Sequence, residues 1–146
     1  MIISSVEEII KNKTTVTVPG STRVSCVCET LTEQNTGAVL VVDDTRLRGI
    51  FTERDAVTRI IAKGLTPTET RVEEVMTPEP KTVTTGCTLV DAVDVMAKNN
   101  CRHVPVVRGN EIVGVLSMRD VPLHYRVLYE NWVSALAGEE IRAPTE

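Results

Sequence analysis

Two seven-residue stretches decide the fold of this chain: GIFTERD at residues 49–55 and GVLSMRD at residues 114–120. The differences 114 − 49 and 120 − 55 are both 65, so the two stretches stand in register. The same offset holds without a gap back to residues 17–18 and 82–83, which both read Thr-Val. A repeat at a fixed spacing indicates that one structural unit occurs twice along the chain.

The similarity extends to the segment before each copy. Residues 6–9 (VEEI) and residues 72–75 (VEEV) match at an offset of 66. We therefore expect a first repeat with its N-terminal helix at residues 1–66 and a second repeat with its linker at residues 67–137. A C-terminal tail follows at residues 138–146, and the two repeats together are expected to form one paired module.

The spacing of apolar residues predicts the same order of elements in both copies. The apolar positions of the first predicted helix are Val24, Val27, Cys28 and Leu31. They fall at i, i+3, i+4 and i+7, which is one face of a helix, and residues 89–96 repeat this pattern. The first copy is expected to contain strands at residues 15–18, 38–42 and 47–51, a helix at 23–34 and a last helix that ends near Gly64. The second copy is expected to contain strands at residues 81–83, 103–107 and 112–116 and helices at 88–99 and 122–137.

These elements define a mixed α/β (α+β) class of fold. Each copy is expected to be a small sheet of two or three strands packed with two helices. A unit of about 65 residues buries too little surface to be secure alone. The two copies are therefore expected to associate around a pseudo-twofold axis.

The composition limits the classes of function. The net charge of −4 disfavours nonspecific nucleic-acid binding, which depends on clustered Lys and Arg. The longest apolar run, residues 38–42, is far shorter than the roughly 20 residues of a membrane span. The N-terminus does not read as a signal peptide, and four cysteines without such a signal are typical of reduced thiols. We expect a cytoplasmic protein that binds neither nucleic acid nor membrane.

Four stretches resemble the CBS-domain family: VEEVMTP at residues 72–78, GAVLVVD at 37–43, GIFTERD at 49–55 and HVPVV at 103–107. The similarity covers most of the chain and occurs twice in register. The resemblance implies a pair of repeats whose cleft holds AMP, ADP, ATP, NAD or S-adenosylmethionine.

The ligand motif of the family is a Gly, a short apolar stretch, a Ser or Thr, two further residues and an Asp. It is matched by Gly49, Thr52 and Asp55 in the first copy and by Gly114, Ser117 and Asp120 in the second. A hydroxyl where a strand enters a helix lies beside unpaired backbone N–H groups, which favour a phosphate. The Asp can accept hydrogen bonds from ribose hydroxyls, and the Gly lets a ligand or another backbone come close. The expected floor of the adenine pocket consists of Ile50, Phe51, Val115 and Leu116.

The Ser/Thr-x-x-Asp spacing is also a helix-capping pattern, and an isolated match would more often be a cap alone. Two copies with a Gly at the same spacing, together with the family resemblance, favour a ligand site. Both roles are compatible, because Asp55 can change its partner when a ligand arrives.

Four basic residues are candidates for phosphate contact. Arg54 and Arg119 adjoin the two aspartates, and the alternative for each is a solvated arginine on a helix surface. Arg102 and His103 stand where the first copy has Gly-Ala at residues 37–38, and basic residues at this place often contact phosphate in the family. The alternative for Arg102 is a surface salt bridge, and that for His103 is a structural role at the start of a strand.

The sequence contains no recognisable catalytic set. The two histidines, His103 and His124, do not form the paired spacing of a metal or acid–base site. Cys26 and Cys28, two positions apart on one helix, point to different sides and are expected to be core or interface thiols. A redox role for Cys26, Cys87 or Cys101 is the alternative. We expect a regulatory protein that is not an enzyme and needs no cofactor.

Two hypotheses of function follow. The first is a sensor that binds an adenine nucleotide (AMP, ADP or ATP, with NAD and S-adenosylmethionine as further ligands) and acts through a dimer or a partner enzyme or transporter. The second is a structural or dimerisation scaffold whose pockets are empty. A homodimer is expected through the apolar helix faces at residues 24–31 and 89–96, although part of each face must be core.

Overall fold

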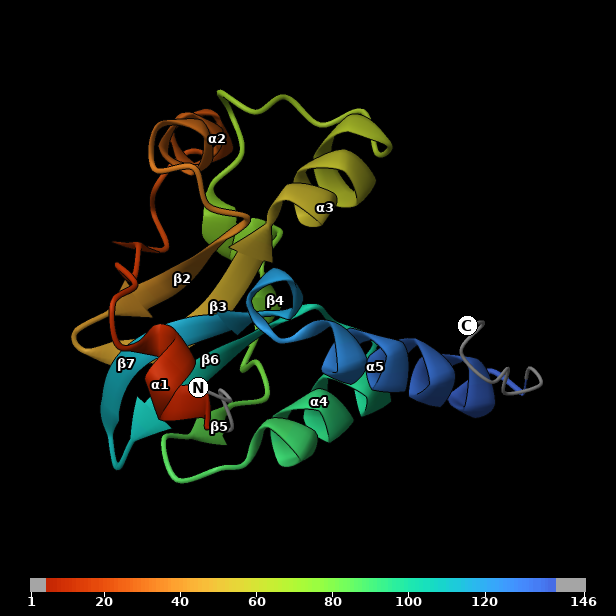
Figure 1. Cartoon of the computed structure of the whole chain (residues 1–146). Coiled ribbons are helices and arrows are strands. Elements are labelled where there is room, and N and C mark those ends of the chain that lie inside the picture. Colours follow the sequence, from red (N-terminus) through yellow and green to blue (C-terminus); the bar gives the residue numbers. More distant parts are fainter. Residues whose placement is uncertain (1–4, 139–146) are drawn as a thin grey trace. The chain divides into compact units, whose positions relative to one another are not determined.

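The computed structural model of the chain describes residues 5–138. The chain divides into two compact units, which are described separately (Figure 1). Within the described residues, the first unit is residues 15–80, and the second joins residues 81–138 to residues 5–14. This division differs from the predicted repeat boundaries, because the N-terminal helix belongs to the unit of the second copy and the linker to that of the first. Apart from Gly138, the predicted C-terminal tail lies outside the described residues.

The first unit contains a four-stranded sheet in the order β1-β2-β3-β4. The strands are β1 (Thr17–Val18), which is parallel to β2 (Ala38–Asp43), then β3 (Arg46–Thr52) and β4 (Thr77–Pro78), which are antiparallel to their neighbours. The sequence predicts only two or three strands. The fourth comes from the segment that precedes the second copy, where Thr77 pairs with Ile50 and Pro78 pairs with Gly49.

The helical segments of the first unit are α2 (Val24–Glu33), α3 (Glu53–Asp55), the π-helical η1 (Ala56–Ile61) and the 3₁₀ turn η2 (Val72–Glu74). The predicted helix ending near Gly64 corresponds to α3 and η1. Gly64 has a φ of +67°, and its N–H donates to the carbonyl of Ile61 at 3.1 Å. The next N–H, of Leu65, donates to the carbonyl of Ile60 at 3.0 Å. Glycine adopts this left-handed conformation at low cost, so its predicted role as a helix stop is confirmed.

The second unit contains a three-stranded sheet in the order β5-β6-β7. Its elements are α1 (Val6–Ile10), β5 (Val83–Thr84), α4 (Leu89–Lys98), β6 (His103–Arg108), β7 (Glu111–Ser117), the 3₁₀ turn η3 (Met118–Asp120) and α5 (Leu123–Leu136). Helices α4 and α5 lie side by side, and α1 packs against β7 (Figure 1). The predicted mixed α/β class, with a small sheet in each copy, is confirmed.

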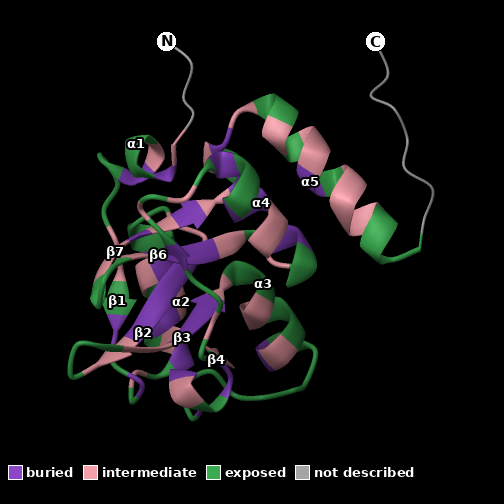
Figure 2. Cartoon of the chain, turned by 90° about the horizontal axis from the view of Figure 1, so that it is seen from below, coloured by how far each residue is buried: buried purple, intermediate pink, exposed green. Residues whose placement is uncertain are grey.

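Each unit has its own cluster of buried apolar side chains, and β2 is buried over most of its length (Figure 2). The cluster of the first unit includes Val24, Val27 and Leu31 of the α2 stripe, and the partly buried Cys28 packs against it. The cluster of the second unit includes Leu89, Ala92, Val93 and Met96 of α4. These apolar residues thus pack inside their own units, as the sequence led us to expect for part of each face, and a dimer through the exposed remainder of α2 and α4 stays a prediction.

The large apolar side chains that are exposed lie on other segments. Within the described residues they are Val57, Ile61, Leu65, Val90, Leu123 and Leu136. Two of them, Val57 and Ile61, belong to η1, and two, Leu123 and Leu136, belong to α5.

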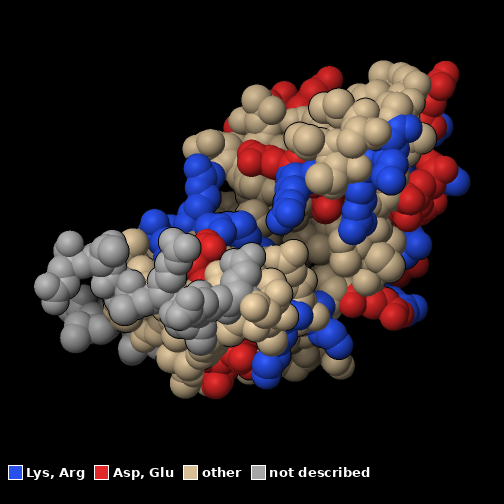
Figure 3. All heavy atoms as spheres, turned by 90° about the vertical axis from the view of Figure 1, so that its right-hand side faces the viewer, with Lys and Arg blue, Asp and Glu red and all other residues tan. Residues whose placement is uncertain are grey.

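Figure 3 shows many Asp and Glu side chains on the same face as Lys and Arg side chains. No helix within residues 5–138 is both long and apolar enough to span a bilayer.

The two repeated glycines explain how each preceding segment docks on a sheet. A Cβ atom at Gly49 would lie 2.8 Å from the Cγ of Met76 and 2.8 Å from the carbonyl oxygen of Thr77. A Cβ atom at Gly114 would lie 3.2 Å from the Cβ of Ile10. Each glycine thus leaves room for the segment that precedes the other copy in sequence. This close approach allows the segment before each copy to pack on the sheet of the other copy.

Candidate functional site

The turn after β3 holds the motif of the first copy. Thr52 is the N-cap of α3, and its Oγ1 accepts a hydrogen bond from the backbone N–H of Asp55 at 3.2 Å. The Asp55 Oδ2 accepts one from the backbone N–H of Thr52 at 2.9 Å. The Asp55 Oδ1 lies 3.5 Å from the Nε of Arg59. The capping alternative is therefore realised in the first copy, and both carboxylate oxygens have partners, one in the capping turn and one on η1.

The turn after β7 holds the motif of the second copy and is built differently. The Oγ of Ser117 accepts a hydrogen bond from the backbone N–H of Arg119 at 3.3 Å, so η3 is a short 3₁₀ turn without a capping box. The Asp120 Oδ1 forms an ion pair with the Nζ of Lys13. The Asp120 Oδ2 is buried and has no hydrogen-bond partner among the described residues.

The two aspartates thus differ in the state of their carboxylates. An unpaired buried polar atom costs about 1–3 kcal/mol relative to a paired one. Asp120 carries such an atom, whereas Asp55 does not. A hydroxyl donor that reaches Asp120 recovers this cost, but one that reaches Asp55 must first displace the Thr52 backbone N–H. The second copy is therefore the better prepared of the two to accept a hydrogen bond.

The space beside the two motif glycines is filled by side chains of the same unit. Gly49 and Gly114 accommodate Met76 and Ile10, so the close approach expected at these glycines is made by the protein itself. The Ile50 side chain is buried, and Val115 is partly buried. Whether these residues also contact a ligand stays a prediction.

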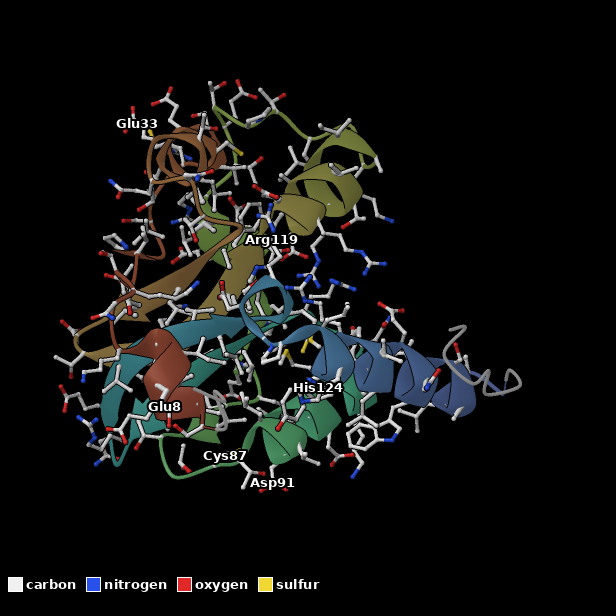
Figure 4. The ribbon with its side chains drawn as sticks, viewed as in Figure 1. Glu8, Glu33, Cys87, Asp91, Arg119 and His124 are labelled. Carbon is white, nitrogen blue, oxygen red and sulfur yellow. The ribbon has the colours of Figure 1, made fainter. Side chains whose placement is uncertain are left out.

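The two arginines beside the aspartates are both exposed. Arg54 lies in α3, and Arg119 lies in the turn after β7, where it is labelled in Figure 4. The carbonyl of Arg119 accepts a hydrogen bond from the Nη2 of Arg126 at 3.1 Å. Arg126 also donates from Nε to the carbonyl of Val121 at 3.1 Å, so it ties the η3 turn to the start of α5.

Arg102 forms the surface salt bridge that the sequence left as an alternative. Its Nη1 lies 3.1 Å from the Oε1 of Glu130, and its guanidinium lies 5.4 Å from the ring centre of Tyr129. The Tyr129 hydroxyl donates to the carbonyl of Cys101 at 3.1 Å, which fixes α5 beside the start of β6. His103 is partly buried as the first residue of β6, opposite Ser117 in the register. A phosphate at Arg102 would have to compete with Glu130.

A cluster of charged residues in the first unit lies outside the predicted ligand motif. The Nη1 of Arg48 lies 2.6 Å from the Oδ2 of Asp43 and 3.1 Å from the Oε2 of Glu73. The hydrogen bond from Arg48 lowers the pKa of the Asp43 carboxyl. In the second unit, Arg108 and Glu7 occupy the positions that match Asp43 and Glu73, and they pair at 3.1 Å. In both units, these ion pairs attach the preceding segment to the sheet.

The described residues contain no group of His, Cys, Asp and Glu that would hold a metal ion. All four cysteines are free thiols, and Cys26 is exposed rather than buried in a core. Burial raises the pKa of the Cys28, Cys87 and Cys101 thiols, which disfavours the reactive thiolate.

Comparison with known proteins gives the family. The CBS domain model matches twice, at residues 6–62 and 72–121. This chain therefore belongs to the CBS domain family, as the two copies of the motif and the two small sheets indicated. Domains of this family generally bind adenosine-containing ligands.

Two relatives illustrate the range of proteins that contain this module. The chain is 36% identical over 103 residues to the CBS domain-containing protein CBSCBSPB3 of Arabidopsis thaliana, a match that covers 70% of this chain and 18% of that protein. It is 30% identical over 122 residues to the CBS domain-containing protein YhcV of Bacillus subtilis, with 84% and 86% covered. The chain thus spans less than a fifth of the Arabidopsis protein but most of YhcV.

Solved structures agree with the fold. A CBS-domain protein of Burkholderia ambifaria, provisionally described as a signal-transduction protein, is 27% identical with a TM-score of 0.75, and the match covers 97% of this chain and 99% of that one. A CBS-domain protein of Agrobacterium tumefaciens is 29% identical with a TM-score of 0.73, and 80% and 94% are covered. A hexameric CBS-CP12 protein from cyanobacteria is 22% identical with a TM-score of 0.74, covering 97% and 87%, which shows the fold alone.

Proposed function

We propose that this protein is a regulatory sensor of adenine nucleotides that acts through a dimer or a partner enzyme or transporter and is not itself a catalyst. The observation that carries the proposal is the state of Asp120. Its carboxylate stands at the ribose position of the family motif and keeps one buried oxygen, Oδ2, without a partner among the described residues. Ribose hydroxyls are donors that would satisfy this oxygen. AMP, ADP and ATP are the ligands proposed first, with NAD and S-adenosylmethionine as further candidates.

Binding is expected to stabilise the folded chain. A ligand that binds only the folded state raises the free energy of unfolding by about 2.7 kcal/mol at a hundredfold excess over Kd. For a chain of this length, that gain shifts the melting temperature by several degrees. Thermal unfolding with millimolar AMP, ADP, ATP, NAD or S-adenosylmethionine measures the shift, and guanosine monophosphate is the control. An unchanged melting temperature with all five ligands would reject the sensor.

The second candidate function is a scaffold whose surface, rather than its pockets, is used. Two observations favour it. Both carboxylate oxygens of Asp55 have partners in the first unit, and large apolar side chains are exposed on η1 and α5. If no nucleotide changes the melting temperature and the chain self-associates stably, the scaffold is the function selected.

We expect a homodimer that uses the exposed apolar residues of η1. Ile61 is 72% exposed and Val57 is 56% exposed, and burying such side chains in a partner is favourable. Sedimentation of the parent should give a dimer at tens of micromolar, whereas Ile61→Asp should sediment as a 16.0 kDa monomer. Val90→Asp, on the exposed side of α4, is the matched control and should remain dimeric. A monomeric parent, or equal effects of the two changes, would show that this surface is not an interface.

A further inference from the structure

The N-terminal segment brings a lysine to the aspartate of the second copy. Helix α1 begins at the Ser5 cap and buries Ile10 against the place that Gly114 leaves open on β7. The chain then turns, and the backbone N–H of Lys13 donates to the carbonyl of Ile10 at 3.0 Å. This turn directs Lys13 to the end of β7, where its Nζ pairs with the Oδ1 of Asp120. The docking of α1 therefore determines the position of this cation.

The first copy has no such lysine. At the offset of 66, the counterpart of Lys13 is Glu79, which has an exposed side chain and the opposite charge. The cation near Asp55 is Arg59, which belongs to the same helical segment rather than to a preceding one. The pair between Lys13 and Asp120 is thus a property of the second copy alone, and the difference lies outside the motif itself.

The Lys13 ammonium has the chemistry to bind a second acceptor. It carries three donors, and Asp120 Oδ1 takes one of them. The Lys13 side chain is 41% exposed, whereas that of Asp120 is 19% exposed. An anionic group that approached Asp120 without a cation would meet a like charge. With Lys13 in place, the carboxylate is neutralised and donors remain for a phosphate oxygen.

We propose that Lys13 is a specificity-determining residue of the second copy, which makes the site at Asp120 prefer phosphorylated adenosine ligands over adenosine itself. The inference rests on the proposed nucleotide-sensing function and adds the N-terminal segment to its site. Asp120 accepts the ribose hydroxyls through the oxygen that has no partner, while Lys13 keeps its pair with Oδ1 and uses its remaining donors for the phosphate. A neutral nucleoside gains only the first of these interactions.

A purely structural ion pair has a different consequence. If Lys13 only attached the N-terminal segment, its removal would lower stability and weaken all ligands alike. A surface pair of this kind contributes little to stability in any case. A role in specificity instead changes the ratio of the two affinities, which a loss of stability does not do.

The test is calorimetric titration of the full chain with AMP and with adenosine. Lys13→Gln is expected to weaken AMP binding about tenfold or more, because a charge-assisted hydrogen bond is lost, and to leave adenosine binding unchanged. Lys13→Arg keeps the cation and should retain most of the preference for AMP. Lys11→Gln, an equal change of charge at an exposed position two residues earlier, is the matched control and should behave as the parent. Circular dichroism establishes that each variant is folded.

The outcomes separate this inference from the function on which it rests. If the parent binds AMP and the Lys13 and Lys11 variants lose the same amount, or if Lys13→Gln weakens AMP and adenosine equally, Lys13 does not set specificity. If the parent binds neither ligand, the nucleotide-sensing function itself is rejected, and the assignment of Lys13 is rejected with it.

Discussion

Asp120→Ala should abolish the tighter of two nucleotide-binding events and leave the weaker one in place. The Oδ2 of Asp120 is buried and has no hydrogen-bond partner among the described residues, so a ribose hydroxyl that reaches it displaces no hydrogen bond of that oxygen. Each bond to a charged acceptor contributes about 1.5–3 kcal/mol, so losing two of them weakens binding by at least about a hundredfold. Titration calorimetry with AMP measures both events, and the surviving event should keep the affinity that it has in the parent.

The complementary change is Asp55→Ala, which should remove the weaker event. Asp55 must release the Thr52 backbone N–H before it accepts a ribose hydroxyl, so part of the binding free energy is used to open the cap. The same substitution should lower the free energy of unfolding by about 1 kcal/mol, because the capping box is lost. Asp120→Ala has no cap to lose.

The control for both changes is Asp94→Ala, which removes one negative charge and an exposed i,i+4 ion pair with Lys98. It should leave both binding events intact. Equal weakening of the two events by each motif variant, or no weakening by either, would show that the family motif does not bind ligand in this chain.

The repeat made most of the architecture predictable. The strands and helices expected from the 65-residue offset agree with the structure to within about two residues, because apolar spacing within a segment reflects local geometry. The exchange of leading segments was not predictable in this way. The similarity of residues 6–9 and 72–75 shows that each copy has such a segment. It does not show on which sheet the segment packs, since this depends on long-range contacts such as those of Ile10 and Met76.

The same limit applies to the site. Thr52 with Asp55 and Ser117 with Asp120 are equivalent in sequence, yet only the first pair forms a capping box. The difference arises from the turn that follows each strand and from Lys13, which lies more than a hundred residues before Asp120 in the chain. The sequence does distinguish Lys13, because alignment of the two copies at the offset of 66 places this lysine opposite an acidic residue, Glu79. Similarly, apolar spacing on α2 and α4 indicates a buried face but not whether the chain or a partner buries it.

Gly49→Ala should destabilise the first unit far more than Gly114→Ala destabilises the second. A methyl group at Gly49 would meet the side chain of Met76 and would lie 2.8 Å from the carbonyl oxygen of Thr77. Because that oxygen belongs to the paired strand β4, it cannot move without breaking the sheet. Overpacking of this kind costs about 3 kcal/mol, and the methyl group of Gly114→Ala, 3.2 Å from the Cβ of Ile10, should cost about 1 kcal/mol or less.

Urea denaturation followed by circular dichroism measures both changes. A double variant, Gly49→Ala with Met76→Ala, separates the two obstacles at Gly49. Shortening Met76 removes the side-chain clash but leaves the Thr77 carbonyl oxygen in place, so it should restore only part of the loss. Full restoration would mean that the thioether alone excludes a side chain at this position. Equal stability of Gly49→Ala and Gly114→Ala would mean that β4 moves as easily as α1, and that the close approach at Gly49 does not hold β4 to the first unit.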